Sequence, residues 1–235
     1  MFYAVTGANH IAGRTNVIAF DPLDPNVFYC GAAGGGVWKT YDGGATWAPL
    51  TDQLSALTCG ALAVDPNDFL TVYFGTGEQN YSLDSYYGDG IFKSTDGGDT
   101  WVRVATTAVG RYFSTIVVDP NSSSIVYAAG SSGVYKSTNG GSTWSSTGSG
   151  NSVNSLVIDP IAPEILYCSR GGPGTNVIRK STNSGGTWTT LTNGLPSSQA
   201  GRTQLAISQS DPLTLYASIA NSSNSSLLGL YRTTD

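Results

Sequence analysis

The sequence predicts an all-β fold made of repeated four-stranded antiparallel units, and three elements that recur in step along the chain carry this prediction. Repeats are the first feature to seek, because missing them leads to the wrong fold. The most regular element is a turn of the form Lys/Arg-Ser/Thr-x-Asp/Asn-x-Gly-x-Thr-Trp. It occurs at 39–47, 93–101, 136–144 and 180–188, and a fifth copy begins at 232–235.

Two further elements keep step with this turn. Apolar segments ending in Asp-Pro occur at 19–22, 63–66, 117–120 and 157–160. Apolar runs around a tyrosine occur at 27–30, 71–74, 125–128, 165–168 and 214–217. Each unit therefore reads as four strands: one ending at Asp-Pro, one through the tyrosine, one leading into the turn and one beginning at Thr-Trp. Proline stops the first strand, and the turn glycines permit positive φ.

Four antiparallel strands repeated every ~45 residues match one blade of a β-propeller. The sequence thus predicts one propeller domain over residues 1–235. Its blade units are expected at 14–50, 58–104, 111–147, 152–191 and 202–235. Residues 1–7 could complete the fifth unit and close a five-bladed ring, which removes an open sheet edge. The alternative is that the chain forms part of a larger propeller, and the sequence leaves both open.

The repeated Ser/Thr-x-Asp-x-Gly-x-x-Trp pattern resembles the Asp-box, or BNR, repeat of sialidases, sortilins, photosystem stability factors and family 74 xyloglucanases. Gly35-Gly-Val-Trp-Lys39 is most similar to bacterial secreted propellers of the sortilin and xyloglucanase group. The resemblance implies that the aspartate or asparagine ties the turn while the tryptophan packs between blades. The residues with this structural role are Asp42, Trp47, Asp96, Trp101, Asn139, Trp144, Asn183 and Trp188.

Composition excludes several function classes. The 235 residues carry a formal net charge of −5, which argues against nucleic acid and anionic membranes as partners. The single histidine, His10, leaves little material for His-based triads or metal sites. We expect no cofactor and no metal, and Cys30, Cys59 and Cys168 read as small buried core residues. Abundant Ser, Thr, Asn and Gly with scarce Lys favour a secreted or cell-surface location, although no signal peptide is visible.

Loops after the second and fourth strands of each unit vary in length and share one face, where ligands of propellers typically bind. The longest, 77–90, carries three carboxylates among tyrosines. Aromatic rings stack on sugars while acids bind hydroxyls, so this loop is a candidate glycan site. Its candidate residues are Glu78, Tyr81, Asp84, Tyr86, Tyr87 and Asp89, and the three acids are the catalytic candidates if the chain is an enzyme. A solvated tyrosine-rich loop is the structural alternative.

Three arginines form a second candidate. Arg14, Arg111 and Arg202 lie just before the expected first strand of their units, where the other two units have Thr58 and Ser152. Equivalent inner-strand positions converge towards a propeller axis, so the three guanidiniums could together bind a carboxylate ligand. Bonds to loop carbonyls or to an acidic neighbour are the structural alternative.

Resemblance to family 74 implies a catalytic aspartate two residues before the matching Gly-Gly pair, and that position is Ala33 here. We therefore predict a non-catalytic recognition or structural module that binds glycan or protein through the variable-loop face, with neighbouring domains possible in a longer chain. The alternative is a glycoside hydrolase or lyase of the xyloglucanase or sialidase type. An assembly factor like the photosystem propellers is a third possibility, which the acidic composition disfavours.

Overall fold

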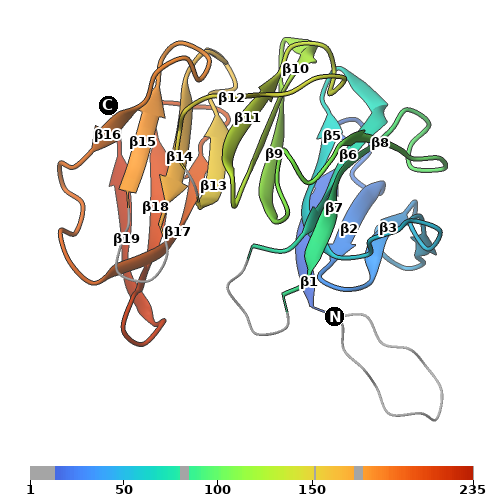
Figure 1. The fold of residues 1–235 in the computed structure, drawn as a ribbon, viewed down its shortest axis with the longest axis horizontal. Coiled ribbons are helices and arrows are strands. Elements are labelled where there is room, and N and C mark those ends of the chain that lie inside the picture. Colours follow the sequence, from blue (N-terminus) through green and yellow to red (C-terminus); the bar gives the residue numbers. More distant parts are fainter. Residues whose placement is uncertain (1–13, 80–84, 151, 172–176, 235) are drawn as a thin grey trace. The chain divides into compact units, whose positions relative to one another are not determined.

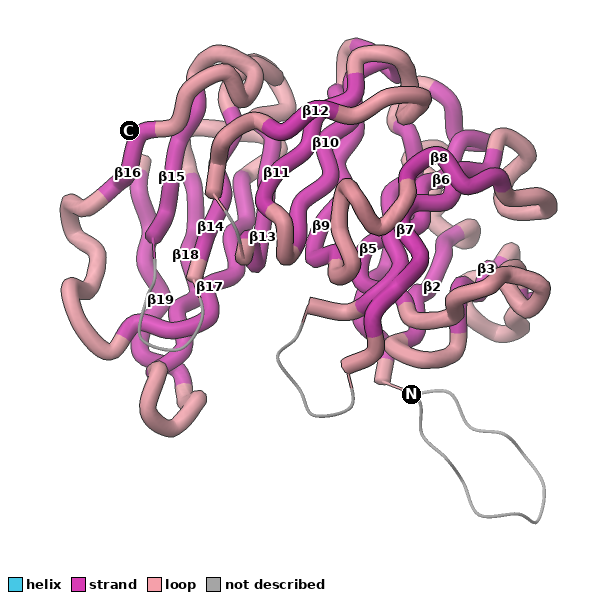
Figure 2. The backbone as a smooth tube through the Cα atoms, in the orientation of Figure 1, coloured by secondary structure: helices cyan, strands magenta, loops and turns pink. Residues whose placement is uncertain are grey.

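The computed structural model describes residues 14–79, 85–150, 152–171 and 177–234. Within these residues every regular element is a β-strand (Figures 1 and 2). The chain divides into two compact units, Met1–Phe113 and Ser114–Asp235. The closing strand predicted at 1–7, together with His10, Tyr81 and Asp84, lies outside the described residues.

The first unit contains two four-stranded antiparallel sheets, ordered β1-β2-β3-β4 and β5-β6-β7-β8. Their strands are β1 Thr15–Phe20, β2 Phe28–Ala32, β3 Gly36–Thr40, β4 Ala48–Pro49, β5 Cys59–Asp65, β6 Asp68–Gly77, β7 Tyr87–Ser94 and β8 Val102–Ala105. The last seven residues of β6 are all buried, so this strand is covered on both faces. The short fourth strand β4 is exposed.

The second unit contains two four-stranded sheets, β9 to β12 and β13 to β16, and one of three strands, β17-β18-β19. Their strands are β9 Phe113–Asp119, β10 Ser122–Gly130, β11 Gly133–Ser137, β12 Ser145–Ser146, β13 Val153–Ile158, β14 Leu166–Arg170, β15 Val177–Ser181, β16 Thr189–Leu191, β17 Ala200–Ile207, β18 Leu215–Asn221 and β19 Leu227–Thr233. No strand pairs with the outer edge of β19 among the described residues.

The five sheets follow the predicted repeat units in order, which confirms the all-β class and fits five blades. The Asp-Pro element does end a first strand, because β5 and β9 stop at Asp65 and Asp119. One detail differs from the prediction. The fourth strands begin one residue after the tryptophan rather than at it. In the first turn the tryptophan closes the turn, because the Trp47 indole donates to the Gly44 carbonyl (3.0 Å).

The core consists of apolar clusters between neighbouring sheets of each unit. In the first unit Tyr29 and Val37 of one sheet pack with Leu62, Phe74 and Phe92 of the next. The three cysteines are free and buried, as the sequence predicts. Burial raises the pKa of the Cys168 thiol to about 12, so that thiol is not a reactive nucleophile.

The four complete turns share one hydrogen-bond pattern. A carboxylate or amide oxygen accepts from the backbone N–H four residues on, as in Thr46 N to Asp42 Oδ1 (2.8 Å) and Thr187 N to Asn183 Oδ1 (2.8 Å). Ser184 stands where the other turns have glycine and adopts φ +58°, close to the +70° of Gly43. The substitution of serine therefore leaves the backbone of the turn unchanged.

Because of these hydrogen bonds, we expect the free energy of unfolding to depend on pH in the acid range. Hydrogen bonds, above all those from the threonine hydroxyls Thr46 and Thr100, lower the pKa of Asp42 and Asp96 to about 2. A carboxyl whose folded pKa lies below its unfolded value stabilises the fold above the unfolded pKa. That contribution is lost as the pH falls through the folded pKa. We expect the double variant Asp42→Asn/Asp96→Asn to lose less stability between pH ~4 and ~2 than the parent, because Asn139 and Asn183 already make the same backbone bond without titrating.

Urea unfolding at several pH values measures this difference. The matched control is Asp52→Asn, at an exposed aspartate whose side chain makes no hydrogen bond within the described part of the chain. An acid profile of the double variant that coincides with the parent profile would contradict a role of the two carboxylates in the turn.

Candidate functional site

The end of β6 positions Glu78 in the first unit. Gly77 adopts φ +79°, and its N–H donates to the backbone oxygen of Thr58 (2.8 Å). A Cβ on Gly77 would overlap the Arg111 carbonyl, so only glycine allows these segments to approach so closely. Glu78 then forms a parallel bridge with Phe113. Three strand ends thus meet around a single glycine, and the next residue carries the carboxylate.

Glu78 and Arg14 form a two-pronged ion pair. Both guanidinium Nη atoms donate to the carboxylate, Nη2 to Oε2 at 2.6 Å and Nη1 to Oε1. The Glu78 side chain is 1% exposed, whereas that of Arg14 is 42% exposed. One guanidinium thus engages both oxygens of the Glu78 carboxylate. Glu78 is therefore a buried partner of Arg14, a position poorly suited to contact with a substrate.

Asp89 is also engaged by neighbours. Its Oδ1 accepts from Arg103 Nη1 (2.7 Å) and its Oδ2 from the Ser55 hydroxyl (2.7 Å). Its backbone N–H donates to Thr76 Oγ1 (2.8 Å). The side chain remains one-third exposed, so the pair lies at the surface. Both described candidate acids therefore carry an arginine partner.

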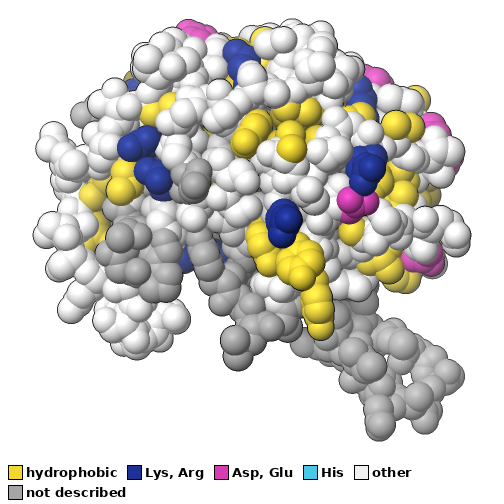
Figure 3. Space-filling model, viewed as in Figure 1, with side chains coloured by type: hydrophobic (Ala, Val, Ile, Leu, Met, Phe, Trp, Pro, Cys, Tyr) yellow, Lys and Arg dark blue, Asp and Glu magenta, His cyan; other side chains and the backbone are white. Residues whose placement is uncertain are grey.

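Exposed tyrosines lie beside these carboxylates in the sequence. Tyr86 and Tyr87 are 70% and 68% exposed. The Tyr87 ring packs edge-on against Tyr112, with centroids 6.2 Å apart. Arg111 is exposed next to Tyr112, and its carbonyl accepts from Gly88 N (2.8 Å), which ties the two segments together. Figure 3 shows hydrophobic side chains exposed beside the lower end of β7, next to a basic one.

Two of the three arginines lie just before the first strand of their sheet, and the third lies within it. Arg14 directly precedes β1 and Arg111 lies two residues before β9. Arg202, in contrast, is the third residue of β17, which begins at Ala200 and carries a register shift there. Its pairing register nevertheless matches that of Arg14, because Arg202 directly precedes Thr203, which pairs with the fifth residue of β18, as Arg14 directly precedes Thr15, which pairs with the fifth residue of β2. Arg202 belongs to the second unit and is not counted with the site of the first.

Sequence reasoning named Arg14 and Glu78 without pairing them with each other, and it missed two further participants of this site, Arg103 and Tyr112. The Arg14–Glu78 pair joins residues 64 positions apart, and no sequence signal announces it. Arg103 lies on a fourth strand, where its pairing with Asp89 across β7 and β8 was not expected. Tyr112 could have been found, because it directly follows Arg111, which the sequence had singled out.

Ala33 lies in the turn between β2 and β3, beside the backbone of Arg14. Its N–H donates to the Arg14 carbonyl (2.9 Å), which ties the turn to the residue before β1. In the described part of the chain no three His, Cys, Asp or Glu residues form a group that could hold a metal ion. The described residues also contain no helix long and apolar enough to cross a membrane.

Comparisons with known proteins point to one enzyme family. Xyloglucanase Xgh74A of Acetivibrio thermocellus is 33% identical over 122 residues, which span 44% of this chain and 13% of that protein. A xyloglucanase from Paenibacillus is 30% identical over 131 residues, 48% of this chain and 12% of that protein. No protein-family model matches the chain. The matched residues make up 13% and 12% of these two xyloglucanases, so the chain spans only a small part of the curated relatives that it matches.

Solved structures agree with the sequence relationship. The glycoside hydrolase family 74 enzyme of Niastella koreensis superimposes with a TM-score of 0.73 at 26% identity, over 94% of this chain and 35% of that one. YCF48 bound to D1 peptide superimposes with a TM-score of 0.62 at 13% identity, over 93% of this chain and 67% of that one, which speaks for the fold alone. The chain is thus a propeller-type β-protein related to glycoside hydrolase family 74.

Proposed function

We propose that this chain is a non-catalytic recognition module of a secreted or cell-surface protein, and that it binds glycan through the tyrosine-rich loop face of the first unit. The observation that carries the proposal is that this face exposes aromatic rings while its acidic side chains are bound by arginines. Tyr86 and Tyr87 expose their rings to solvent, while Glu78 and Asp89 are each bound by an arginine. Exposed rings offer stacking surfaces to sugars, and carboxylates bound by arginines have oxygens already engaged within the protein.

The relationship to xyloglucanases supports xyloglucan as the first ligand to test. Those relatives are named for acting on xyloglucan. A ring platform beside an exposed guanidinium, as at Tyr87, Tyr112 and Arg111, offers stacking and hydrogen bonding together. Such a platform recognises a polysaccharide chain without the two opposed carboxyls that hydrolysis requires.

Xyloglucan oligosaccharide binding, measured by isothermal titration calorimetry, tests the proposal. We expect Tyr87→Ala and Arg111→Ala each to weaken binding about tenfold, since a stacked ring or a charged hydrogen bond contributes ~1–2 kcal/mol. The control is Tyr41→Ala, at an exposed tyrosine in the turn after β3 of the same unit. Absence of saturable binding to xyloglucan and to a panel of other glycans would contradict glycan recognition and favour a protein ligand at this face.

A glycoside hydrolase is the second candidate, favoured by the family 74 relationship. It predicts release of reducing sugar from xyloglucan that is lost in Asp89→Asn or Glu78→Gln. Thermal unfolding of each variant separates a lost catalytic group from a lost fold. Release that disappears in a variant with an unchanged melting temperature would overturn the non-catalytic proposal. Binding without release in the parent chain would exclude hydrolysis of that substrate.

A further inference from the structure

Two arginines of the second unit depart from the repeat at neighbouring positions. In each sheet one residue of the third strand pairs with the residue that follows the repeated tyrosine, and these third-strand residues are Trp38, Phe92, Tyr135, Arg179 and Tyr231. Two residues beyond that pairing partner, the second strands carry Ala32, Thr76, Gly130, Arg170 and Ile219. Among the five described sheets, only β13 to β16 has an arginine at either position, and it has one at both.

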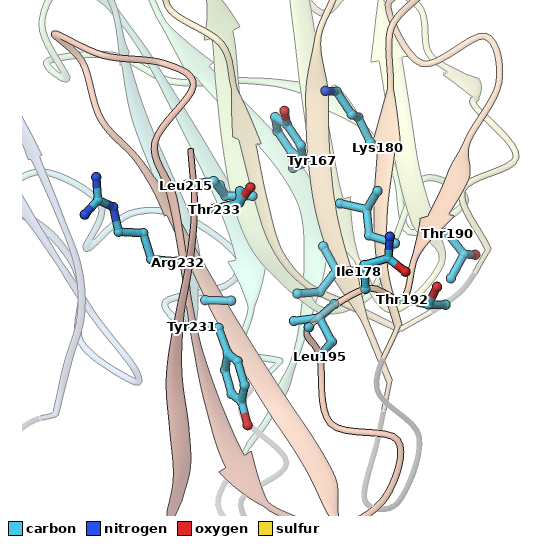
Figure 4. Close-up of a pocket in the computed structure, with 14 residues that line it drawn as sticks. Tyr167, Ile178, Lys180, Thr190, Thr192, Leu195, Leu215, Tyr231, Arg232 and Thr233 are labelled. Carbon is cyan, nitrogen blue, oxygen red and sulfur yellow. The ribbon is translucent and has the colours of Figure 1, made fainter. Parts of the chain in front are cut away.

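Both arginines lie on the same face of this sheet. Arg179 pairs across the strands with Cys168, and Arg170 follows Cys168 by two residues along β14. Side chains alternate along a strand, and diagonal neighbours lie within reach of long side chains. Tyr167 and Lys180 therefore belong to the opposite face, where they line a cavity of about 360 Å³ (Figure 4). Burial raises the pKa of the Cys168 thiol, whereas the charges of Arg179 and Arg170 lower it, so both guanidiniums lie near that thiol.

The two arginines face the short loop that follows β12 in the preceding sheet. Arg179 Nη1 donates to the Ser149 carbonyl (2.9 Å). The Arg170 guanidinium lies against Gly150, where an added Cβ would stand 2.4 Å from its Cζ. The backbone N–H groups of Ser149 and Gly150 make no hydrogen bond within the described part of the chain. The loop therefore joins two guanidiniums and offers unused N–H donors beside them.

The backbone of this loop has the conformation of an anion-binding turn. Gly148 and Gly150 adopt φ +69° and +83°, on either side of Ser149. Alternation of left-handed and ordinary residues turns successive backbone N–H groups towards one side, which forms a concavity that attracts anions. Glycine supplies the left-handed positions at little cost.

The acidic residues of the second unit lie at the other end of its strands. Those described are all at the end of a first strand or in the connection that follows it: Asp119, Asp159, Glu164 and Asp211. Arg170, in contrast, is the last residue of β14, and both arginines remain partly exposed. This segregation makes the arginine end of the unit positive, and a positive concavity raises the local concentration of anions. Two like charges on one face also repel each other, and a bound anion relieves that repulsion.

We propose that Arg170, Arg179 and the loop 148–150 form a binding site for a carboxylate. The planar guanidinium presents donors in a fork that matches the two oxygens of a carboxylate. Arg179 has five N–H donors and uses one of them for Ser149, so others are left for a ligand. The same chemistry is carried by a free organic acid and by a uronic acid of a saccharide. The site lies within the second unit and does not depend on the glycan proposal for the first.

Isothermal titration calorimetry of the full chain with tri-galacturonate and with succinate tests the site, and galactotriose is the neutral control. We expect saturable binding of a carboxylate that weakens as salt is raised, because the arginines are partly exposed. Arg170→Thr and Arg179→Tyr should each weaken this binding about tenfold, since each removes a charged donor. The new side chains are those that Thr76 and Tyr135 supply at the same positions of other sheets, so thermal unfolding should show a retained fold.

Arg232→Gln is the matched control, because Arg232 is an exposed arginine of the same unit on β19, and carboxylate affinity should not change. Binding of tri-galacturonate without succinate would support the site and identify an acidic saccharide as the source of the carboxylate. Equal binding of succinate would support it with the free acid as ligand. Absence of saturable binding for both, equal binding of galactotriose, unchanged affinity in both arginine variants, or tighter binding of inorganic phosphate than of either carboxylate would overturn the proposal.

Discussion

Replacing Arg14 with methionine is expected to destabilise the first unit by about 3 kcal/mol, because it removes one partner of a buried charge. The Glu78 side chain is 1% exposed and accepts from both Nη atoms of Arg14. Methionine keeps much of the aliphatic volume but supplies no donor. The free energy of unfolding in urea measures the effect.

Two variants separate the charge effect from a packing effect. Arg103→Met removes a similar partner from Asp89, but that carboxylate is 34% exposed, so the expected cost is below about 1 kcal/mol. The double variant Arg14→Met/Glu78→Gln should recover part of the loss, because no buried charge then lacks its partner. Equal losses for Arg14→Met and Arg103→Met would show that burial of Glu78 does not determine the cost.

Replacing Gly77 with alanine is expected to prevent stable folding of the first unit. The added Cβ would meet the backbone of Arg111 and Gly88, which cannot move without parting the strand ends around Glu78. Positive φ alone costs alanine about 1–2 kcal/mol. Overlap with backbone atoms adds more, so we expect a total loss above ~4 kcal/mol, the exceptional range for one substitution.

Two glycines provide matched controls for this prediction. Gly194 has φ +71° with open space around its Cβ position, so alanine there should cost only the conformational term. Gly34 has open space and no positive φ in the left-handed region, so alanine there should be neutral or slightly stabilising. Thermal unfolding should rank the variants Gly34, Gly194 and Gly77 in order of falling stability. A Gly77→Ala variant as stable as Gly194→Ala would contradict the close approach of the strand ends.

Much of the fold could be predicted because its signals are local and repeated. The Asp-Pro segments, the tyrosine runs and the Gly-containing turns mark strand ends by backbone chemistry alone, and β5 and β9 do end at Asp65 and Asp119. The register shift in β17 could not be predicted in this way. Counting residues placed Arg202 before the strand, whereas the strand begins at Ala200. The extra residues lie beyond a shift in pairing register, and no residue pattern in the sequence indicates such a shift.

The candidate site could be predicted only in part. The loop and its tyrosines were visible because a long insertion in a regular repeat is visible. The partners of its acids were not, since they depend on which strand ends meet. The pairing of Arg14 with Glu78 arises within the first unit, where the residue before β1 meets the end of β6, and Glu78 also bridges to Phe113.

The sequence by itself determined the all-β class, the repeat of five units and the turn that links the third and fourth strands, because each rests on residues within a few positions of one another. Only the tertiary structure decided that Glu78 is a buried, arginine-bound carboxylate and that Tyr167 and Lys180 line a cavity. Both facts concern burial and contact between distant segments. Those are set by how strands and sheets pack, which no single repeat encodes.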